Sequence, residues 1–179
     1  MENQENRNSD MNPDLPRTLL TQLWNSCLSQ EEWFPPLEHA LKGIMAEQAS
    51  WLPKEGPANS IYGIVQHLIF YKKRLLMEAR GEQGAAGYPE VENNTATFEV
   101  HDSSEAAWTA SREELYRLHR EMSTILAAYK PEDLLRPLED GSVMMENIRV
   151  LAMHDAYHIG QIVLLAKMQG AWPSTRSFN

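Results

Sequence analysis

The residues with the clearest chemical potential are His154 and His158, four positions apart in the string HDAYH. Residues i and i+4 of an α-helix lie one above the other on one face, so both imidazoles can reach a single ion. Unpaired imidazoles on a buried face are costly, and neutral imidazole is a good ligand for zinc, nickel, iron and copper. The pair therefore predicts either a metal site or two hydrogen-bonded core histidines. The face is continued, at steps of three and four, by Met144, Ile148, Leu151, Ile162 and Leu165.

A third histidine, His67, comes three residues after Ile64 and four before Tyr71, so it flanks the predicted buried face of another helix. Three histidines directed into one core favour a divalent metal site over ordinary core histidines. The HDAYH string is not the zincin motif H-E-x-x-H, because Asp155 replaces the glutamate and its side chain is one methylene shorter. We expect Asp155 either to orient a ligand or to face solvent.

Other polar residues near these histidines are weaker catalytic candidates. Tyr71 lies one turn from His67, and its hydroxyl could contact a substrate. Gln161 lies one turn from His158, and its amide could donate a hydrogen bond near the metal. For both side chains, structural packing is the favoured alternative. Tyr157 points about 100° away from its neighbour in sequence, so we expect it to pack against a neighbouring helix.

The remaining histidines and the single cysteine lack ligand spacing. His39, His101 and His119 are expected at the surface, with His39 the one whose short helix could approach the site. Cys27 is the only cysteine, which excludes an intrachain disulfide. Its place in an amphipathic segment predicts a small buried residue rather than a nucleophile.

Four long amphipathic helices must position these residues. Apolar periodicity predicts them over about 16–29, from Ser60 to about 81, from about 103 or 104 to the break at Pro131, and over about 143–169. Ser60 is the expected N-cap of the second helix, and Asp102 or Ser103 that of the third. The pattern is that of a helix bundle.

The connections are expected to be polar, with one short extra helix. Residues 37–42 predict that short helix, closed by Gly43. Residues 46–60 contain several Pro and Gly residues and predict a loop, whereas residues 81–101 form an unusually long connection. The sequence does not say whether this connection closes over the site.

The chain length and composition predict one soluble domain. The chain has 179 residues and a formal net charge of −9, which disfavours binding to nucleic acid. No stretch is long and apolar enough to span a membrane, and residues 1–14 lack the apolar core of a secretory signal, so we expect a cytoplasmic protein. The expected organisation is a tail over residues 1–13, one domain over 14–172 and a second tail over 173–179.

Two segments carry a resemblance to a known family: Ile64-Val-Gln-His67-Leu-Ile and, more specifically, His154-Asp-Ala-Tyr-His158-Ile-Gly-Gln-Ile162. Together with the order of elements over about residues 18–169, they make the sequence similar to the DinB/YfiT-like superfamily of small bacterial four-helix proteins. The resemblance implies an all-α four-helix bundle and a metal triad of His67, His154 and His158 that holds zinc or nickel. It also implies a homodimer packed through helices.

The resemblance and the residues together lead to two functional hypotheses. Three protein ligands leave a coordination position for water or substrate, which would support hydrolysis or the activation of a thiol. Better-understood relatives transfer low-molecular-weight thiols, such as bacillithiol, glutathione analogues or mycothiol, to electrophiles. The first hypothesis is therefore a metal-dependent thiol S-transferase or hydrolase acting on a small molecule. The alternative is a non-catalytic, metal-stabilised or ligand-binding dimeric module.

Overall fold

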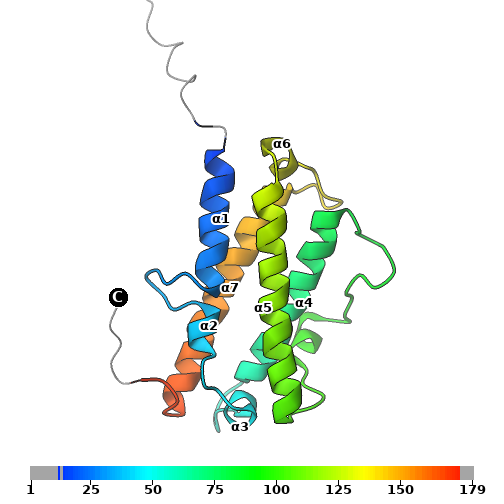
Figure 1. Ribbon diagram of the computed structural model, residues 1–179. Coiled ribbons are helices and arrows are strands. Elements are labelled where there is room, and N and C mark those ends of the chain that lie inside the picture. Colours follow the sequence, from blue (N-terminus) through cyan, green and yellow to red (C-terminus); the bar gives the residue numbers. More distant parts are fainter. Residues whose placement is uncertain (1–11, 13, 174–179) are drawn as a thin grey trace, which may run out of the picture.

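Four long helices form the body of the molecule in the computed structural model, which describes residue 12 and residues 14–173 (Figure 1). They are α1 (Leu15–Leu28), α4 (Ile61–Arg80), α5 (Glu105–Ala128) and α7 (Met144–Met168). Helix α4 packs against α5 and α7, and α1 packs against the same two helices from the other side. The predicted all-α four-helix bundle is confirmed. The expected tails, 1–13 and 173–179, lie outside the described residues except at positions 12 and 173.

The ends of the long helices follow the capping signals in the sequence, with one exception. The Gly63 amide donates to Ser60 Oγ at 3.0 Å, and Gly81 ends α4 with a φ of 74°. The predicted cap of α5 was wrong by one or two residues, because the helix begins at Glu105 and Ser104 is its N-cap. Asp102 instead accepts a hydrogen bond from the Ser104 amide at 2.8 Å and shapes the turn that precedes the helix.

Three short helices fill the connections, where one was expected. The predicted short helix is α2 (Leu37–Ala40), and the additional ones are α3 (Ala46–Ser50) and α6 (Pro131–Leu134). The prediction of loop throughout 46–60 was wrong because the first five residues contain neither Gly nor Pro, and the Met45 amide donates to Gln48 Oε1 at 3.1 Å. None of the described helices is both long and apolar enough to cross a bilayer.

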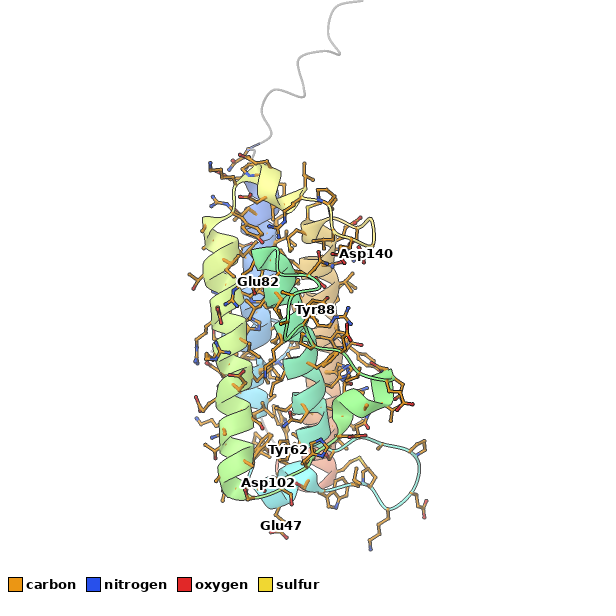
Figure 2. The ribbon with its side chains drawn as sticks, turned by 90° about the vertical axis from the view of Figure 1, so that its right-hand side faces the viewer. Glu47, Tyr62, Glu82, Tyr88, Asp102 and Asp140 are labelled. Atoms are coloured by element: carbon orange, nitrogen blue, oxygen red, sulfur yellow. The ribbon has the colours of Figure 1, made fainter. Side chains whose placement is uncertain are left out.

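The long connection between α4 and α5 returns to the bundle as a 3-10 helix, η1 (Asn94–Phe98), which packs against α4. Figure 2 shows this connection beside α4, with Tyr88 in its first half. Gly63 permits the close approach, because a Cβ at this position would lie 2.9 Å from the Phe98 carbonyl oxygen. The end of η1 therefore lies over the first two turns of α4.

Two polar side chains lie in the core, and one of them, His119, was expected at the surface. Lys72 is 1% exposed and His119 is completely buried. Both face Asp155, which is also completely buried and so does not face solvent. The carboxylate supplies the partner without which a buried ammonium group would be too costly.

Candidate metal centre

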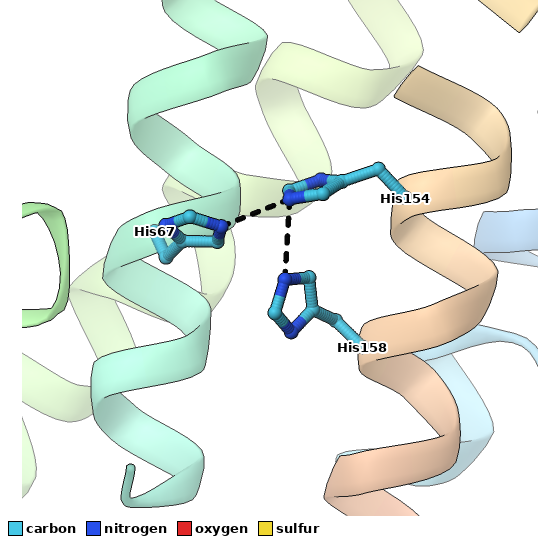
Figure 3. Close-up of side chains that lie close together, drawn as sticks. All are labelled: His67, His154 and His158. Carbon is cyan, nitrogen blue, oxygen red and sulfur yellow. Dashed lines mark hydrogen bonds between the residues drawn. The ribbon is translucent and has the colours of Figure 1, made fainter. Parts of the chain in front are cut away.

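The three predicted ligands meet between α4 and α7. The two helices run antiparallel and place His67 opposite His154 and His158 (Figure 3). His154 lies in the middle: its Nε2 is 2.9 Å from His67 Nε2 and 3.1 Å from His158 Nε2. His67 and His158 are buried, and one nitrogen from each of the three rings lies within 4.8 Å of the others. This group could hold a metal ion.

Thr97 determines which nitrogen of His67 carries the proton. The Thr97 hydroxyl donates its only hydrogen to the Asn94 carbonyl oxygen at 2.6 Å. The contact of 2.5 Å between Thr97 Oγ1 and His67 Nδ1 is then a hydrogen bond in which the imidazole donates. A neutral imidazole has one N–H, so Nε2 of His67 presents its lone pair to the site.

Gln161 does the same for His158. Its amide oxygen, Oε1, lies 2.7 Å from His158 Nδ1, so the ring nitrogen donates and Nε2 is again left with a lone pair. Gln161 therefore accepts a hydrogen bond from a ligand residue, whereas the sequence suggested that it would donate one near the metal. Partners of this kind on the far ring nitrogen are the usual companions of metal-binding histidines.

His154 cannot satisfy both neighbours with protons. Its Nε2 faces two lone pairs and carries at most one hydrogen, while its Nδ1 is buried and has no hydrogen-bond partner among the described residues. The nitrogens of a tetrahedral site, each about 2.0–2.1 Å from the ion, lie roughly 3.4 Å apart. The two separations from His154 Nε2, 2.9 and 3.1 Å, need only a small expansion to reach that value. A cation shared by three lone pairs fits this donor set better than any arrangement of protons.

Burial keeps the three imidazoles neutral. It lowers the pKa of His67 to about 3, with further contributions from His154 and His158. Burial, followed by the neighbouring His158, lowers the pKa of His154 to about 4, and burial also lowers the pKa of His158. Because metals bind the neutral ring, protons compete weakly for these nitrogens at neutral pH.

Comparison with known proteins agrees with this geometry. The sequence profile of the DinB superfamily matches residues 35–162, which include all three histidines. The chain belongs to the DinB superfamily. Comparison with curated proteins and with solved structures finds no match.

Aromatic side chains enclose one side of the DinB histidine triad. The Phe98 ring stacks on His67 with a centroid separation of 3.9 Å, and the Tyr71 ring lies 4.9 Å from His67 and 5.3 Å from His154. The Tyr71 hydroxyl donates to Asn94 Oδ1 at 2.9 Å. The connection before α5 therefore covers part of the site, a role that the sequence left open.

A second polar cluster supports the triad from inside the bundle. Asp155 pairs with the Lys72 ammonium group and lies 3.7 Å from His119 Nδ1, while His119 Nε2 donates to the Trp24 carbonyl oxygen at 2.9 Å. Burial raises the pKa of Asp155, but the Lys72 charge and His119 outweigh it and hold the pKa below its usual value. The residue after His154 is thus an ionised carboxylate paired with Lys72 of α4, and this pair helps to fix the position of α7 against α4.

A cavity of about 850 Å³ opens from the triad along the groove between α4 and α7. Tyr157 lies at its wall and is 65% exposed, so the expectation that it packs against a neighbouring helix was wrong. His101 is exposed as expected, and the His39 ring stacks on Trp172 away from the cavity. The cavity is also lined by Asn59, Tyr71, Arg74, Glu78, Asn94, Phe98, Asp140, Asn147, Val150 and Gln161.

Proposed function

We propose that this DinB protein is a metal-dependent enzyme that acts on a small molecule, as a thiol S-transferase or a hydrolase, with zinc or nickel on His67, His154 and His158. The observation that carries the proposal is the position of the triad at the wall of a cavity of about 850 Å³. Among the described residues, the group contains no fourth Cys, His, Asp or Glu. Structural zinc sites are usually closed by four protein ligands, so three ligands facing a cavity favour catalysis.

The chain's own residues hold and shield the reacting centre. Thr97 and Gln161 fix the two Nε2 lone pairs, and Phe98 covers His67. Tyr71 places a hydroxyl group at the wall of the cavity, one turn from His67. A bound ion of this kind supplies Lewis acidity that activates a water molecule or a thiol near neutral pH.

The chain does not provide a thiol of its own. Cys27 is completely buried, its Sγ lies 3.3 Å from the Ala152 carbonyl oxygen, and burial raises the pKa of its thiol to about 12. This confirms that Cys27 is a buried structural residue. In a transfer reaction, the nucleophilic sulfur would therefore come from a small thiol that enters the cavity.

The test compares metal-loaded, chelator-treated and reloaded protein on two panels, one of thiols with electrophiles and one of hydrolysable esters and amides. We expect turnover that is lost on chelation, restored by zinc or nickel and absent from His158→Ala. Tyr71→Phe serves as the variant that keeps the metal while losing the hydroxyl group. No turnover on either panel in protein that holds one ion per chain would contradict the enzymatic proposal.

The alternative is a metal-stabilised module without turnover. It is supported by the way the triad joins α4 to α7 beside the buried Asp155 cluster. In that case, metal would raise the melting temperature of the wild-type protein and not that of His158→Ala, and no water molecule on the ion would exchange with solvent. A signal from an exchangeable water in the nickel- or cobalt-loaded protein would exclude this alternative.

A further inference from the structure

We propose that the substrate carries a carboxylate group and that Arg74 binds it, two helical turns from the histidine triad. This inference rests on the proposed function and adds a substrate class to it. Arg74 and His67 both lie on α4 and both line the cavity. Seven residues separate them, which corresponds to about 10.5 Å along the helix axis and nearly the same face of the helix.

Arg74 differs from every other basic residue of its helix. Lys72 pairs with Asp155, Lys73 with Glu114, and Arg80 with Glu121. Among the described residues, no carboxylate oxygen lies within ion-pair distance of the Arg74 guanidinium group. Its guanidinium group therefore lies at the wall of a cavity without a direct ion pair.

The guanidinium group is nevertheless held in place. Its Nε donates to the Tyr88 hydroxyl oxygen at 3.1 Å, and its central carbon lies 5.0 Å from the centre of the Tyr88 ring and 5.9 Å from that of Phe70. Within the described part of the chain, the two terminal amino groups make no hydrogen bond. Four of the five N–H donors therefore remain for a ligand, and a carboxylate can take two of them side by side.

Glu78 fixes this arrangement without neutralising it. Its Oε1 accepts a hydrogen bond from the Tyr88 hydroxyl at 2.9 Å, and its Oε2 accepts one from Asn147 Nδ2 at 3.1 Å. Burial, together with Glu78, raises the pKa of Tyr88, so the phenol keeps the proton that it donates. Both oxygens of Glu78 are engaged, and they orient Tyr88, which in turn orients Arg74.

The other end of the groove is apolar. Beyond the triad, a second hollow of about 410 Å³ shares Asn59 and Gln161 with the main cavity. Its walls are otherwise formed by Pro57, Ala58, Ile64, Leu164 and Leu165. A substrate with one anionic end and one apolar end would therefore lie along the groove in a single direction, with its reacting centre at the histidines.

The experiment measures binding of two matched thiols, mercapto-octanoate and mercapto-octanol, to cobalt-loaded protein by the sulfur-to-cobalt absorption band. We expect the wild-type protein to prefer the acid by about tenfold or more, because a charge-assisted bidentate pair is worth at least that ratio. Arg74→Gln should bring the ratio close to one, and Arg74→Lys should leave an intermediate value. Lys73→Gln removes a charge from the neighbouring position outside the cavity and should keep the wild-type ratio.

A second arm separates this inference from the proposed function. Octanoate and octanol are titrated by NMR into the metal-free protein and the same variants. If neither thiol produces a cobalt band while octanoate still binds better in an Arg74-dependent manner, the carboxylate site stands and the thiol chemistry does not. Equal binding of acid and alcohol to the wild-type protein, or an unchanged preference in Arg74→Gln, overturns the inference.

Discussion

Breaking the buried ion pair between Lys72 and Asp155 should cost far more stability than breaking a surface pair. The two side chains are 1% and 0% exposed, so removal of either partner leaves a charge without solvent or counterion. Single removals of this type cost about 3–5 kcal/mol, a large part of the roughly 5–15 kcal/mol that stabilises a small domain. We expect Lys72→Met and Asp155→Leu each to lose about that amount.

The double variant Lys72→Met/Asp155→Leu isolates the interaction. Replacing both charges with apolar groups removes the desolvation penalty with the attraction, so the double variant should be close to wild type and more stable than either single variant. The coupling energy from this cycle should then be at least about 3 kcal/mol. Urea unfolding of metal-free protein, followed by circular dichroism at neutral pH, provides the four free energies of unfolding.

A surface pair provides the matched control. Arg80 and Glu121 also connect α4 with α5, but their side chains are 42% and 29% exposed. The corresponding cycle with Arg80→Met and Glu121→Gln should give a coupling energy of about 0–1 kcal/mol. A value below about 1 kcal/mol for the buried pair as well would refute the reasoning that Asp155 is a dry, ionised anchor of α7.

Three further predictions follow from the packing, the pKa shifts and the surface. Gly63→Ala should destabilise the protein by about 1–3 kcal/mol, because the new Cβ would lie 2.9 Å from the Phe98 carbonyl oxygen and force η1 away from His67. Thermal melting measures this loss, and an unchanged melting temperature would contradict that contact. The folded-state pKa values of His67 and His154, about 3 and about 4, lie below the unfolded value of about 6.5, so the unfolded chain binds more protons below that pH. The metal-free protein should therefore lose about 1.4 kcal/mol of stability per pH unit for each of these two histidines as the pH falls from about 6.5 towards 4. Urea titrations at several pH values test this, and His67→Asn should show a shallower loss. The homodimer stays a prediction, and α7 offers an exposed apolar face for it that includes Met153 and Leu164. The variant Met153→Glu/Leu164→Glu should halve the mass measured by light scattering, and a monomeric wild-type protein would contradict the dimer.

Helical periodicity carries most of what the sequence predicts about the fold. The long helices end close to the predicted residues because Ser60, Gly81 and Gly170 give local signals that need no tertiary contact. The short helices α3 and α6 were missed, since four or five residues are too few to show a period. Their N-cap residues, Met45 and Lys130, are not the usual Ser, Thr, Asp or Asn, so neither helix start carried a strong capping signal.

The triad was predictable because the HDAYH spacing and a third histidine on a buried face are both visible in one dimension. The residues of the supporting cluster also follow the helical spacing of the buried apolar positions. Lys72 lies four residues after Leu68 and three before Leu75, and His119 lies four residues after Leu115. The polarity of His119 led to its assignment to the surface. Only the structure shows that Lys72 pairs with Asp155 and that His119 lies beside the same carboxylate.

The contribution of the long connection could not be read from the sequence. Thr97 and Phe98 are thirty residues or more from His67, and neither has a spacing that relates it to a histidine. Gly63 was the one available signal, because a glycine within a helix can mark the close approach of another segment. The segment that approaches is identified only by the fold.

The most direct test of the account is the metal content of tag-free protein, measured beside a His154→Ala/His158→Ala variant after both are incubated with zinc or nickel and desalted. The account predicts about one ion per wild-type chain, as three converging lone pairs require, and essentially none in the variant. No ion in either protein, or the same content in both, would contradict a metal centre on these histidines.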